Sequence, residues 1–312
     1  MALALDPSTH YKTGLIRCIT KRTGKLHVRG YIDESLLYKV ERSGLEHFII
    51  TDRLKIENEN ELINNLTGGR KFLGLEDPDI WLDEESQRLH VYYTIPFLDE
   101  NRKKTETYLG HAEGNDLDSL KMTAPLISPD AQISRAKEVS IAPKNSRGVR
   151  LNLIESRERN DTIDYSTVRV AVAPNPSDNW SLGNLVFHPK TNGYDWCSGH
   201  ASPGPMFSKN FIDVGKNKVL AILNGREKEV RKNGKAYYGM FSVGLMIYNF
   251  EEGKIEWTSK QPLIKDPNAK TITFASQFVQ TNANEGILYA HIDDSFVRAY
   301  TLRADGLRSL LP

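Results

Sequence analysis

The chain has 312 residues, of which 39% are hydrophobic, with 22 glycines and 14 prolines, which is ordinary for a globular protein. Its 41 basic and 40 acidic side chains leave a net charge of +1, which gives no support for binding to nucleic acid or a membrane surface. Two cysteines exclude a disulfide scaffold. The apolar run at residues 2–5 has no basic leader, and no stretch approaches the ~18 apolar residues that span a bilayer, so we expect a cytoplasmic protein.

Short strands dominate the predicted secondary structure. The helix candidate is the segment 58–66. Leu89, Val91 and Tyr93 alternate with their neighbours and are predicted to share one face of a strand. The segments rich in β-branched and aromatic residues, separated by turn residues, are 89–95, 149–156, 166–173, 218–225, 238–250 and 286–292.

A weak internal repeat organises these strands. Clusters of strands begin near residues 12, 75, 136, 200 and 272, at intervals of roughly 60 residues that suit four-stranded antiparallel units. Radial repetition of such units gives a β-propeller. We therefore predict an all-β, five-bladed β-propeller that forms a single domain over residues 1–312. A two-sheet sandwich is the alternative, but it does not explain why polar residues gather where several units begin.

The polar unit starts predict a common pocket. They read "LGLEDPDI", "SRAKEVSI", "SGHASPGPMF" and "TFASQF", and in a propeller the innermost strands begin around one end of the central channel. Glu76 and Asp77 lie between apolar segments, so at least one of the two carboxylates is expected to point inward, where its pKa shifts as acid catalysis requires. The competing interpretation is a simple turn, which Asp-Pro favours.

Further candidates follow in the third unit. Strand alternation predicts that one of Lys137 and Glu138 faces inward, and both are candidates for substrate binding; the alternative is an ion pair on the surface. Alternation also places Glu155, Arg157 and Arg159 on one face, either as a solvated rim or as a charged pocket wall that binds an anion or activates water.

The fourth and fifth units add aromatic and polar candidates. Trp196 is a candidate sugar-stacking platform, and Ser202 follows in the same glycine- and proline-rich loop. His200 is expected to be hydrogen-bonded and not metal-bound, and we predict no metal site and no cofactor. Asp293 and Asp294 alternate, so one of the two is expected to face the channel.

Several motifs of other enzyme classes are missing from the sequence. It contains no dinucleotide fingerprint, phosphate-binding P-loop, HExxH or G-x-S-x-G segment. Carboxylates in a polar all-β cleft with aromatic neighbours indicate glycosidic chemistry, which needs a proton donor and a base or nucleophile on opposite sides of the bond. We therefore expect an oligosaccharide or glycoside substrate.

The segment "LGLEDPDIW", followed by "LHVYYT", resembles the EDPR segment and following strand of glycoside hydrolase family 130, the β-mannoside phosphorylases and β-1,2-mannosidases. Three further segments are similar to this family in the same order, so the resemblance covers residues from about 14 to 302. They are "AKEVSIAPKNSRGVRLNLIESR", "SPGPMF" with "KVLAILNG", and "ILYAHIDDSFVRAYTL". The resemblance implies a five-bladed propeller that cleaves a glycoside with inversion, with a mannoside as the expected substrate.

The resemblance also implies roles for matched residues. Asp77 matches the catalytic acid, which relays its proton through a sugar hydroxyl, and Glu76 precedes it as in the motif. Lys137 matches a lysine on the substrate side, and Asp294 matches an aspartate that binds the terminal sugar.

The chain departs from the family at four places. Asp79 replaces an arginine, Glu138 replaces an aspartate, and Asn224 stands where phosphorylases have a histidine that binds phosphate. The arginine of a third motif falls on Glu155 or on Arg157. With Glu155 in the pocket as a base we expect water to be the preferred acceptor, whereas Arg157 there, with Arg159 or Arg226 beside it, would preserve an anion site.

Three other functions remain open at this point. The chain is a phosphorylase, a related propeller glycosidase of the arabinanase, xylosidase or fructosidase type, or a propeller that binds carbohydrate without catalysis. In the second case Asp6 would be the base, Asp77 an orienting residue and Glu138 the acid. The sequence leaves the sugar, the linkage and the oligomeric state undetermined.

Overall fold

Five antiparallel groups of strands follow one another along the chain in the computed structural model, which describes residues 2–44, 47–159, 165–178 and 180–312. The second and third groups are joined into one nine-stranded sheet by a parallel pair between Thr107 and Arg135. From inner to outer edge, the first contains β1 (Leu3–Leu5), β2 (Thr13–Thr23), β3 (Ile32–Arg42) and β4 (Phe48–Arg53). The second contains β6 (Glu76–Asp83), β7 (Arg88–Asp99), β8 (Lys104–Gly114) and β9 (Lys121–Met122), with β5 (Lys71–Phe72) also paired to β7. The third contains β10 (Ile133–Ser140), β11 (Arg150–Glu158), β12 (Thr167–Ala173) and β13 (Ser181–Phe187).

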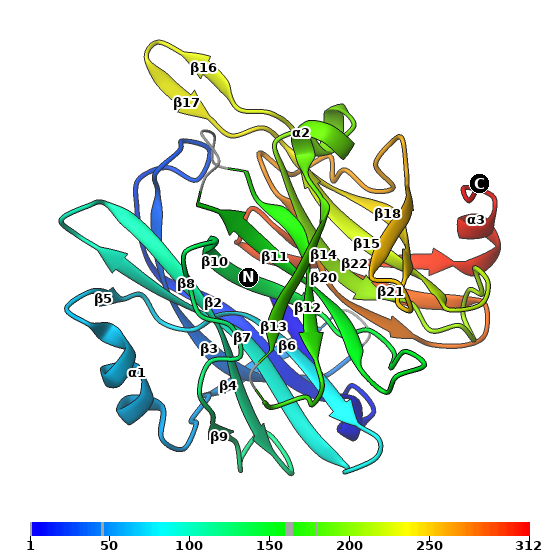
Figure 1. Cartoon of the computed structure of the whole chain (residues 1–312), viewed down its shortest axis with the longest axis horizontal. Helices are drawn as coiled ribbons and strands as arrows, with labels where there is room; N and C mark the ends of the chain where they lie inside the picture. The colour runs from blue at the N-terminus through cyan, green and yellow to red at the C-terminus, as the bar shows by residue number, and fades with distance from the viewer. Residues whose placement is uncertain (1, 45–46, 160–164, 179) are drawn as a thin grey trace.

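The last two sheets and the short helices complete the described elements. The fourth sheet contains β14 (His200–Met206), β15 (Lys218–Arg226), β18 (Phe241–Asn249) and β19 (Lys254–Thr258), and the fifth contains β20 (Thr273–Gln280), β21 (Glu285–Ile292) and β22 (Phe296–Arg303). The connection between β15 and β18 forms a separate hairpin of β16 (Val230–Lys232) and β17 (Lys235–Tyr237), which extends away from the fourth sheet (Figure 1). The helices are α1 (Glu59–Thr67), α2 (Pro189–Asn192) and α3 (Ala304–Arg308), with 3-10 turns at Pro7–Thr9 and Asp195–Cys197.

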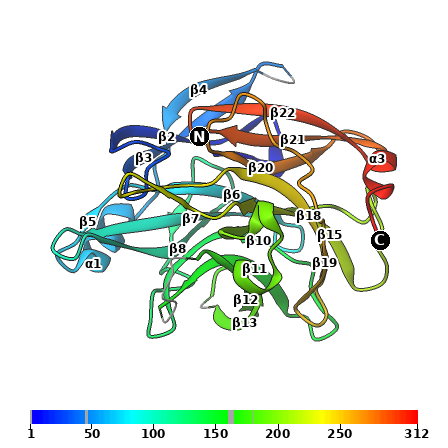
Figure 2. The same cartoon turned by 90° about the horizontal axis from the view of Figure 1, so that it is seen from above.

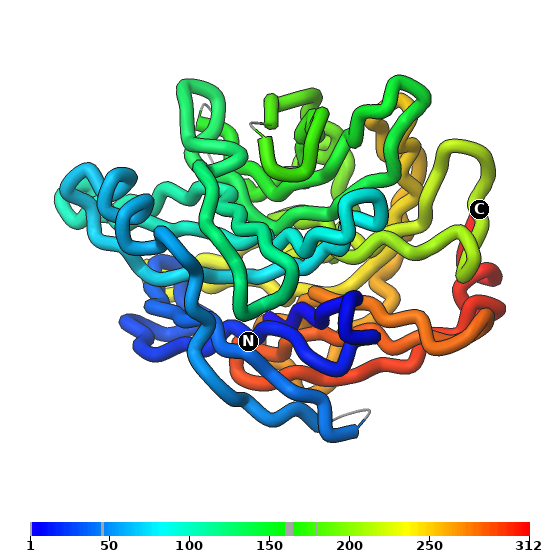
Figure 3. The backbone as a smooth tube through the Cα atoms, turned by 90° about the horizontal axis from the view of Figure 1, so that it is seen from below, coloured from blue at the N-terminus to red at the C-terminus, as the bar shows by residue number. Residues whose placement is uncertain are grey.

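The sheets form a closed ring and are the blades of a five-bladed β-propeller. The innermost strands β1, β6, β10, β14 and β20 contact one another in this order, and β20 contacts β1. Figures 2 and 3 show the last blade, in orange and red, beside the blue first blade. At this closure the Leu3 amide donates to Ser276 Oγ (3.3 Å) and the Leu5 amide to Gln277 Oε1 (3.2 Å). The ring confirms the predicted fold and rejects the sandwich.

One predicted blade boundary is wrong. Four of the innermost strands begin at residues 76, 133, 200 and 273, close to the expected positions, but the first is Leu3–Leu5 and not the strand near residue 12. This strand has only three residues, all buried, so it shows neither the length nor the alternation by which a strand is predicted. The apolar run near the N-terminus is thus the inner strand of blade one.

Apolar side chains fill the spaces between blades. Leu89, Val91 and Tyr93 lie in one buried cluster with Leu15 of blade one, as the alternation of β7 predicts. Tyr92, on the other face of β7, packs in a separate cluster towards blade three. None of the helices in the described residues is both long and apolar enough to cross a membrane.

The predicted sugar platform Trp196 is a core residue. Its side chain is buried and its Nε1 donates to the carbonyl of Ser259 at 3.2 Å. The ring lies so close to Gly225 and Gly244 that a Cβ at those positions would come within 2.5 and 2.3 Å of it. Because the indole is enclosed by blade four, it cannot stack on a ligand, and this interpretation is corrected.

Asn224 and Ser202 are also placed differently from the prediction. Asn224 is fully buried, donates from Nδ2 to the Ala275 carbonyl (3.0 Å) and accepts the Ala275 amide on Oδ1 (2.8 Å). Its amide therefore joins blade four to the inner strand of blade five. Ser202 pairs with Asn224 in the strand register and is fully buried, so neither side chain is exposed to a substrate.

We predict that Asn224→Ala lowers the free energy of unfolding by about 2–4 kcal/mol, because the amide and carbonyl of Ala275 lose their buried partner at roughly 1–3 kcal/mol each. Chemical denaturation measures this loss. The matched control Asn60→Ala, on the exposed side of α1, should change stability by about 0.5 kcal/mol or less. Equal effects of the two substitutions would contradict the structural role of Asn224.

Candidate active site

A cluster of charged side chains lies at one end of the ring of innermost strands, and we call it the mouth cluster. It lies near the start of β1, because the amide of Arg17 donates to the carbonyl of Ala2 at 2.9 Å. Its members are Arg17 and Arg22 of β2, Asp33 and Ser35 of β3, Glu76 and Asp77 of β6, Lys137 and Glu138 of β10, Glu155 of β11, and His291 and Asp294 at the end of β21. Side chains of blades one, two, three and five thus meet in the mouth cluster.

Arg17 holds two carboxylates of the neighbouring blade. Its Nη1 lies 2.9 Å from Asp77 Oδ1 and its Nη2 lies 2.8 Å from Glu76 Oε1. Its Nε donates to Ser35 Oγ at 3.0 Å, so all three nitrogens of the planar fork are used. Sequence analysis missed Arg17, although an arginine within the apolar run "LIRCI" was a signal for a buried ion pair.

Lys137 is the second cation of the mouth cluster. Its Nζ lies 3.6 Å from Asp77 Oδ2, 3.6 Å from Glu138 Oε1 and 3.8 Å from Glu155 Oε2. Burial by itself lowers the pKa of Lys137, but the surrounding carboxylates of Glu155 and Asp77 reverse this and raise the pKa above its ordinary value. The ammonium group therefore stays charged.

Asp77 and Glu138 share an unusual backbone conformation. Their φ angles are 47° and 48°, in the left-handed region, and the strand register jumps at both positions. Such β-bulges re-aim side chains at a cost of roughly 1–3 kcal/mol for each residue in a sparsely populated region. The bulge brings Lys137 and Glu138 into the cluster together, whereas regular strand alternation would turn one of them away.

The pKa values of Asp77 and Glu138 are shifted in opposite directions. Burial raises the pKa of Asp77, but the charges of Arg17 and Lys137 outweigh it and lower the pKa to about 2. Burial and the charge of Asp77 raise the pKa of Glu138 well above its ordinary value, and the two side chains are hydrogen-bonded. These opposite shifts favour the proton on Glu138 and the charge on Asp77, whereas the family resemblance predicts that Asp77 is the acid.

Two further carboxyls lie near this pair. Burial raises the pKa of Glu76 to about 6, although Arg17 opposes the shift. Burial raises the pKa of Asp79 to about 7, and its carboxylate accepts a hydrogen bond from the Ile80 amide. Asp79 lines the central channel, a cavity of about 160 Å³ that also borders Asp77 and Glu138.

The last blade contributes Asp294. Its Oδ1 lies 3.0 Å from His291 Nδ1 and its Oδ2 lies 3.5 Å from Arg22 Nη2. Burial raises the pKa of Asp294, but its contacts with His291 dominate and lower it below the ordinary value. Asp293 instead accepts the amides of Thr271 and Ile272, so it shapes the loop and does not join the cluster.

The arginines after Glu155 differ in position. Arg157 lies two residues further along β11 and is half-buried. Arg159 is exposed and pairs with Glu106 at 2.8 Å, on blade two, so it is not part of the mouth cluster.

Blade four contributes His200 and Arg226, which are paired across β14 and β15. His200 Nδ1 is 2.9 Å from Ser166 Oγ, in agreement with the expected hydrogen bond. Burial and the charge of Arg226 lower the pKa of His200 well below its ordinary value, so the imidazole is neutral. Arg226 is only 8% exposed, and no described carboxylate lies within 4 Å of its guanidinium group. Its Nε has no hydrogen-bond partner.

Aromatic side chains border this part of the mouth. The guanidinium carbon of Arg226 lies 4.1 Å from the ring centroid of Tyr238, and Tyr238 meets Tyr31 edge-on at 6.0 Å. The hairpin β16–β17 pairs with the β2–β3 connection, where the Arg29 amide donates to the Ala236 carbonyl at 3.0 Å (Figure 1). Tyr31 and Tyr238 thus supply the aromatic surface that was predicted for Trp196.

Asp6 lies towards the other end of the channel. Its carboxylate accepts hydrogen bonds from the amide (2.8 Å) and the hydroxyl (2.6 Å) of Ser8. It is four residues beyond Ala2 along the inner strand, which corresponds to about 13 Å at ~3.3 Å per residue. Asp6 therefore cannot act as the base that the arabinanase-type assignment requires.

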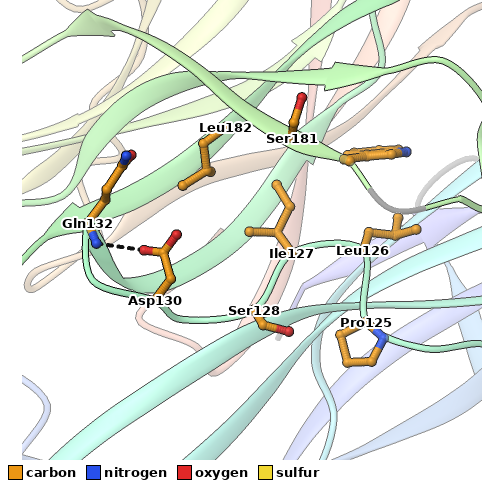
Figure 4. Close-up of a pocket in the computed structure, with 9 residues that line it drawn as sticks. Pro125, Leu126, Ile127, Ser128, Asp130, Gln132, Ser181 and Leu182 are labelled. Carbon is orange, nitrogen blue, oxygen red and sulfur yellow. Dashed lines mark hydrogen bonds between the residues drawn. The ribbon is translucent and has the colours of Figure 1, made fainter.

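A second pocket lies on the outer side of blades two and three. It has a volume of about 420 Å³, and Figure 4 shows it between the β9–β10 connection and β13. Its carboxylate, Asp130, accepts the backbone amide of Gln132 at 2.7 Å. No member of the mouth cluster lines this pocket, so we place the candidate active site at the channel mouth.

Fold and site together define a five-bladed β-propeller with a charged, aromatic-bordered mouth. No protein-family model and no curated protein matches the sequence. The structure is similar to a GDP-Man-dependent mannosyltransferase from Leishmania mexicana (TM-score 0.57, 11% identity, 97% of this chain and 83% of that one). It is also similar to a phosphate complex of a mannose phosphorylase from Leishmania mexicana (0.52, 15%, 93% and 80%). A third similar structure is the α-L-arabinofuranosidase from Lactobacillus brevis (0.58, 9%, 94% and 86%). At these identities the similarity shows the fold alone.

We predict that Glu138→Gln makes the protein more stable than the wild type at neutral and alkaline pH. The raised pKa of Glu138 contributes stability that is complete below its unfolded pKa of about 4.5 and is lost as the pH rises towards the folded value. Glutamine does not titrate, so the difference in unfolding free energy should grow with pH by up to about 1.4 kcal/mol per unit.

Denaturant titrations between pH 4 and 8 test this prediction. Asp77 does not interfere, because its lowered pKa restricts its contribution to lower pH. The exposed Glu61→Gln on α1 is the control, and a difference independent of pH would place the proton elsewhere.

Proposed function

We propose that the protein is a carbohydrate-active enzyme that cleaves a glycosidic bond with inversion and uses Glu138 as the proton donor. The observation that carries this proposal is the group of three carboxyls, Asp77, Glu138 and Glu155, that surround Lys137 Nζ at 3.6, 3.6 and 3.8 Å. Departure of a sugar leaving group requires a proton on the glycosidic oxygen. The side chain of Glu138 is 16% exposed at the mouth, whereas that of Asp77 is 5% exposed, so Glu138 is the more accessible group.

The remaining charges fit this role. Asp77 accepts the hydrogen bond of the acid and keeps the pKa of Glu138 high, and Arg17 and Lys137 keep Asp77 ionised. When Glu138 gives up its proton, Lys137 Nζ, 3.6 Å away, stabilises the carboxylate that forms. The resemblance to glycoside hydrolase family 130 and the glycosidase and phosphorylase activities of the similar structures support this chemistry.

Glu155 is our proposed base for a water nucleophile. Glu138 Oε1 and Glu155 Oε2 lie 3.6 and 3.8 Å from the same Lys137 Nζ, so they are separated by no more than about 7.4 Å. Inverting glycosidases place their carboxyls about 6.5–9.5 Å apart. The upper limit for Glu138 and Glu155 therefore allows a separation at the lower end of that range. Tyr31 and Tyr238 would contact the sugar, for which the resemblance favours a mannoside.

We predict that Glu138→Gln lowers turnover of a manno-oligosaccharide by roughly 10²–10⁴, the usual contribution of general acid catalysis. An aryl glycoside with a very acidic phenol needs little protonation, so its hydrolysis should fall much less. Initial rates on both substrates, with Glu61→Gln as the control, measure the contrast. Equal losses on the two substrates would remove Glu138 from the acid role.

For Asp77→Asn we predict a loss of turnover together with a shift of the pH–rate profile. Removing the negative neighbour lowers the pKa of Glu138, so the alkaline limb, which requires protonated Glu138, moves to lower pH. The pH dependence of kcat/KM measures this shift. A variant with an unchanged alkaline limb, or with activity within about twofold of wild type, would show that Asp77 does not control the acid.

Phosphorolysis is the second candidate function, and Arg226 favours it. A buried guanidinium group without a described carboxylate partner suits phosphate, whose oxygens accept several charge-assisted hydrogen bonds. Asn224 stands where the phosphorylases have a histidine that binds phosphate, and its side-chain amide is hydrogen-bonded to the backbone of Ala275. Because this phosphate ligand is missing, Asn224 favours water as the acceptor.

Under hydrolysis, which we favour, rates on a manno-oligosaccharide should be indifferent to millimolar phosphate and release free sugar. Phosphate-dependent release of a sugar 1-phosphate, abolished in Arg226→Met, would establish phosphorolysis. Binding of the oligosaccharide without turnover under either condition would identify a non-catalytic carbohydrate-binding propeller.

A further inference from the structure

Blade two contains a second cluster of polar side chains, separate from the mouth. His90 on β7 stands opposite Glu113 on β8 in the strand register, and His111 precedes Glu113 by two residues. All three side chains therefore project from one face of the sheet. Their ligand atoms lie within 4.8 Å of one another. His90 is four residues from Thr94, the partner of Glu76, so this cluster is about 13 Å along β7 from the mouth.

The hydrogen bonds of His111 fix its orientation. Its Nδ1 is 2.9 Å from Thr123 Oγ1, and that hydroxyl is placed to give its own proton to the carbonyl of Ala124 at 3.1 Å. Thr123 Oγ1 therefore accepts Nδ1–H, and Nε2 of His111 carries the free lone pair. This lone pair faces His90 Nδ1 at 3.0 Å, while Glu113 Oε2 lies 3.8 Å from the same nitrogen. Histidine ligands of metals are oriented in this way by a hydrogen bond to the other ring nitrogen.

The chemistry of these groups suits a zinc ion. The two imidazoles face each other with ring nitrogens 3.0 Å apart, and a carboxylate oxygen of Glu113 lies 3.8 Å from the nitrogen of His90. Two imidazoles and one carboxylate form a ligand set that zinc takes in proteins, with water in the fourth position. Nitrogen ligands also disfavour magnesium and calcium, which prefer oxygen.

We propose that blade two binds a zinc ion through His90 Nδ1, His111 Nε2 and Glu113 Oε2. Two nitrogens at 2.0–2.1 Å on a tetrahedral ion are about 3.3–3.4 Å apart, about 0.3 Å more than the two ring nitrogens are here. Because the ring centroids are 5.2 Å apart, the two nitrogens point almost directly at each other, so each ring must also turn to direct its lone pair at the ion. Glu113 is 28% exposed at its side chain, so it can move towards the ion and marks the entry side. Its other oxygen faces Arg88 Nη2 at 3.6 Å, which leaves Oε2 for the metal.

The ion would tie three parts of blade two together. His90 lies on β7, His111 and Glu113 lie on β8, and Thr123 follows β9. Without metal, His90 Nδ1–H donates to His111 Nε2, so the apo protein keeps these buried nitrogens partnered. When zinc binds, the Nδ1 proton leaves, and the neutral ring of His90 carries its proton on Nε2 instead. Zinc binding therefore stabilises the folded protein in proportion to its occupancy. This proposal does not depend on the reaction at the mouth.

Chelator-stripped protein titrated with Co²⁺ and Zn²⁺ tests the proposal. We expect one equivalent of Co²⁺ to give the visible absorption of a tetrahedral site, Zn²⁺ to displace it, and Zn²⁺ to raise Tm. Glu113→Gln should weaken zinc binding by at least about tenfold. Loss of a group that only orients a ligand costs about tenfold or more in metal affinity, and loss of a ligand should cost no less. His111→Ala should abolish binding.

His47→Ala, at an exposed histidine outside the cluster, is the matched control and should bind as the wild type does. Because His111→Ala removes a buried side chain, circular dichroism must first show that it is folded, and Glu113→Gln provides the test at a partly exposed position. Absence of tetrahedral Co²⁺ absorption in the wild type, or equal binding by the wild type and Glu113→Gln, would overturn the proposal.

Discussion

The guanidinium group of Arg17 is the contact on which the mouth of this propeller depends. It reaches from blade one to Glu76 and Asp77 of blade two at 2.8 and 2.9 Å. Two buried carboxylates so close together would otherwise repel each other, and one of them would take up a proton. Arg17 and Lys137 hold the pKa of Asp77 down, whereas burial and the charge of Asp77 raise the pKa of Glu138, the next carboxyl of the ring. A cation in one blade thus decides which side chain of another blade is acidic.

The same design appears in the backbone. Asp77 and Glu138 lie on inner strands of neighbouring blades, and both have a left-handed conformation at a β-bulge. A regular strand would turn one of each adjacent pair of side chains away from the channel. The backbone is strained at these bulges, and the bulges bring charged side chains together at the mouth. The apolar clusters between blades stabilise the ring and offset this strain.

The opposite side of the mouth has a different character. Blade four contributes neutral His200 and the buried guanidinium of Arg226, flanked by Tyr238 and Phe241. A substrate at the mouth therefore meets an acidic, proton-rich side in blades two and three and a cationic, aromatic side in blade four. In the proposed reaction, one side would protonate the leaving group and the other would hold the acceptor or the sugar.

The sequence by itself determined the fold and indicated a candidate site where the second blade begins. Spacing and alternation are local properties, so they predicted four of the five inner strands, helix α1 and the placement of Glu76 and Asp77 at the start of a blade. Only the tertiary structure decided what each polar residue does. Trp196 and Asn224 are enclosed by neighbouring strands, Lys137 joins Glu138 through a bulge, and Arg17 holds the pKa of Asp77 down. Burial and pKa depend on partners from other blades, and these partners lie up to hundreds of residues away along the chain.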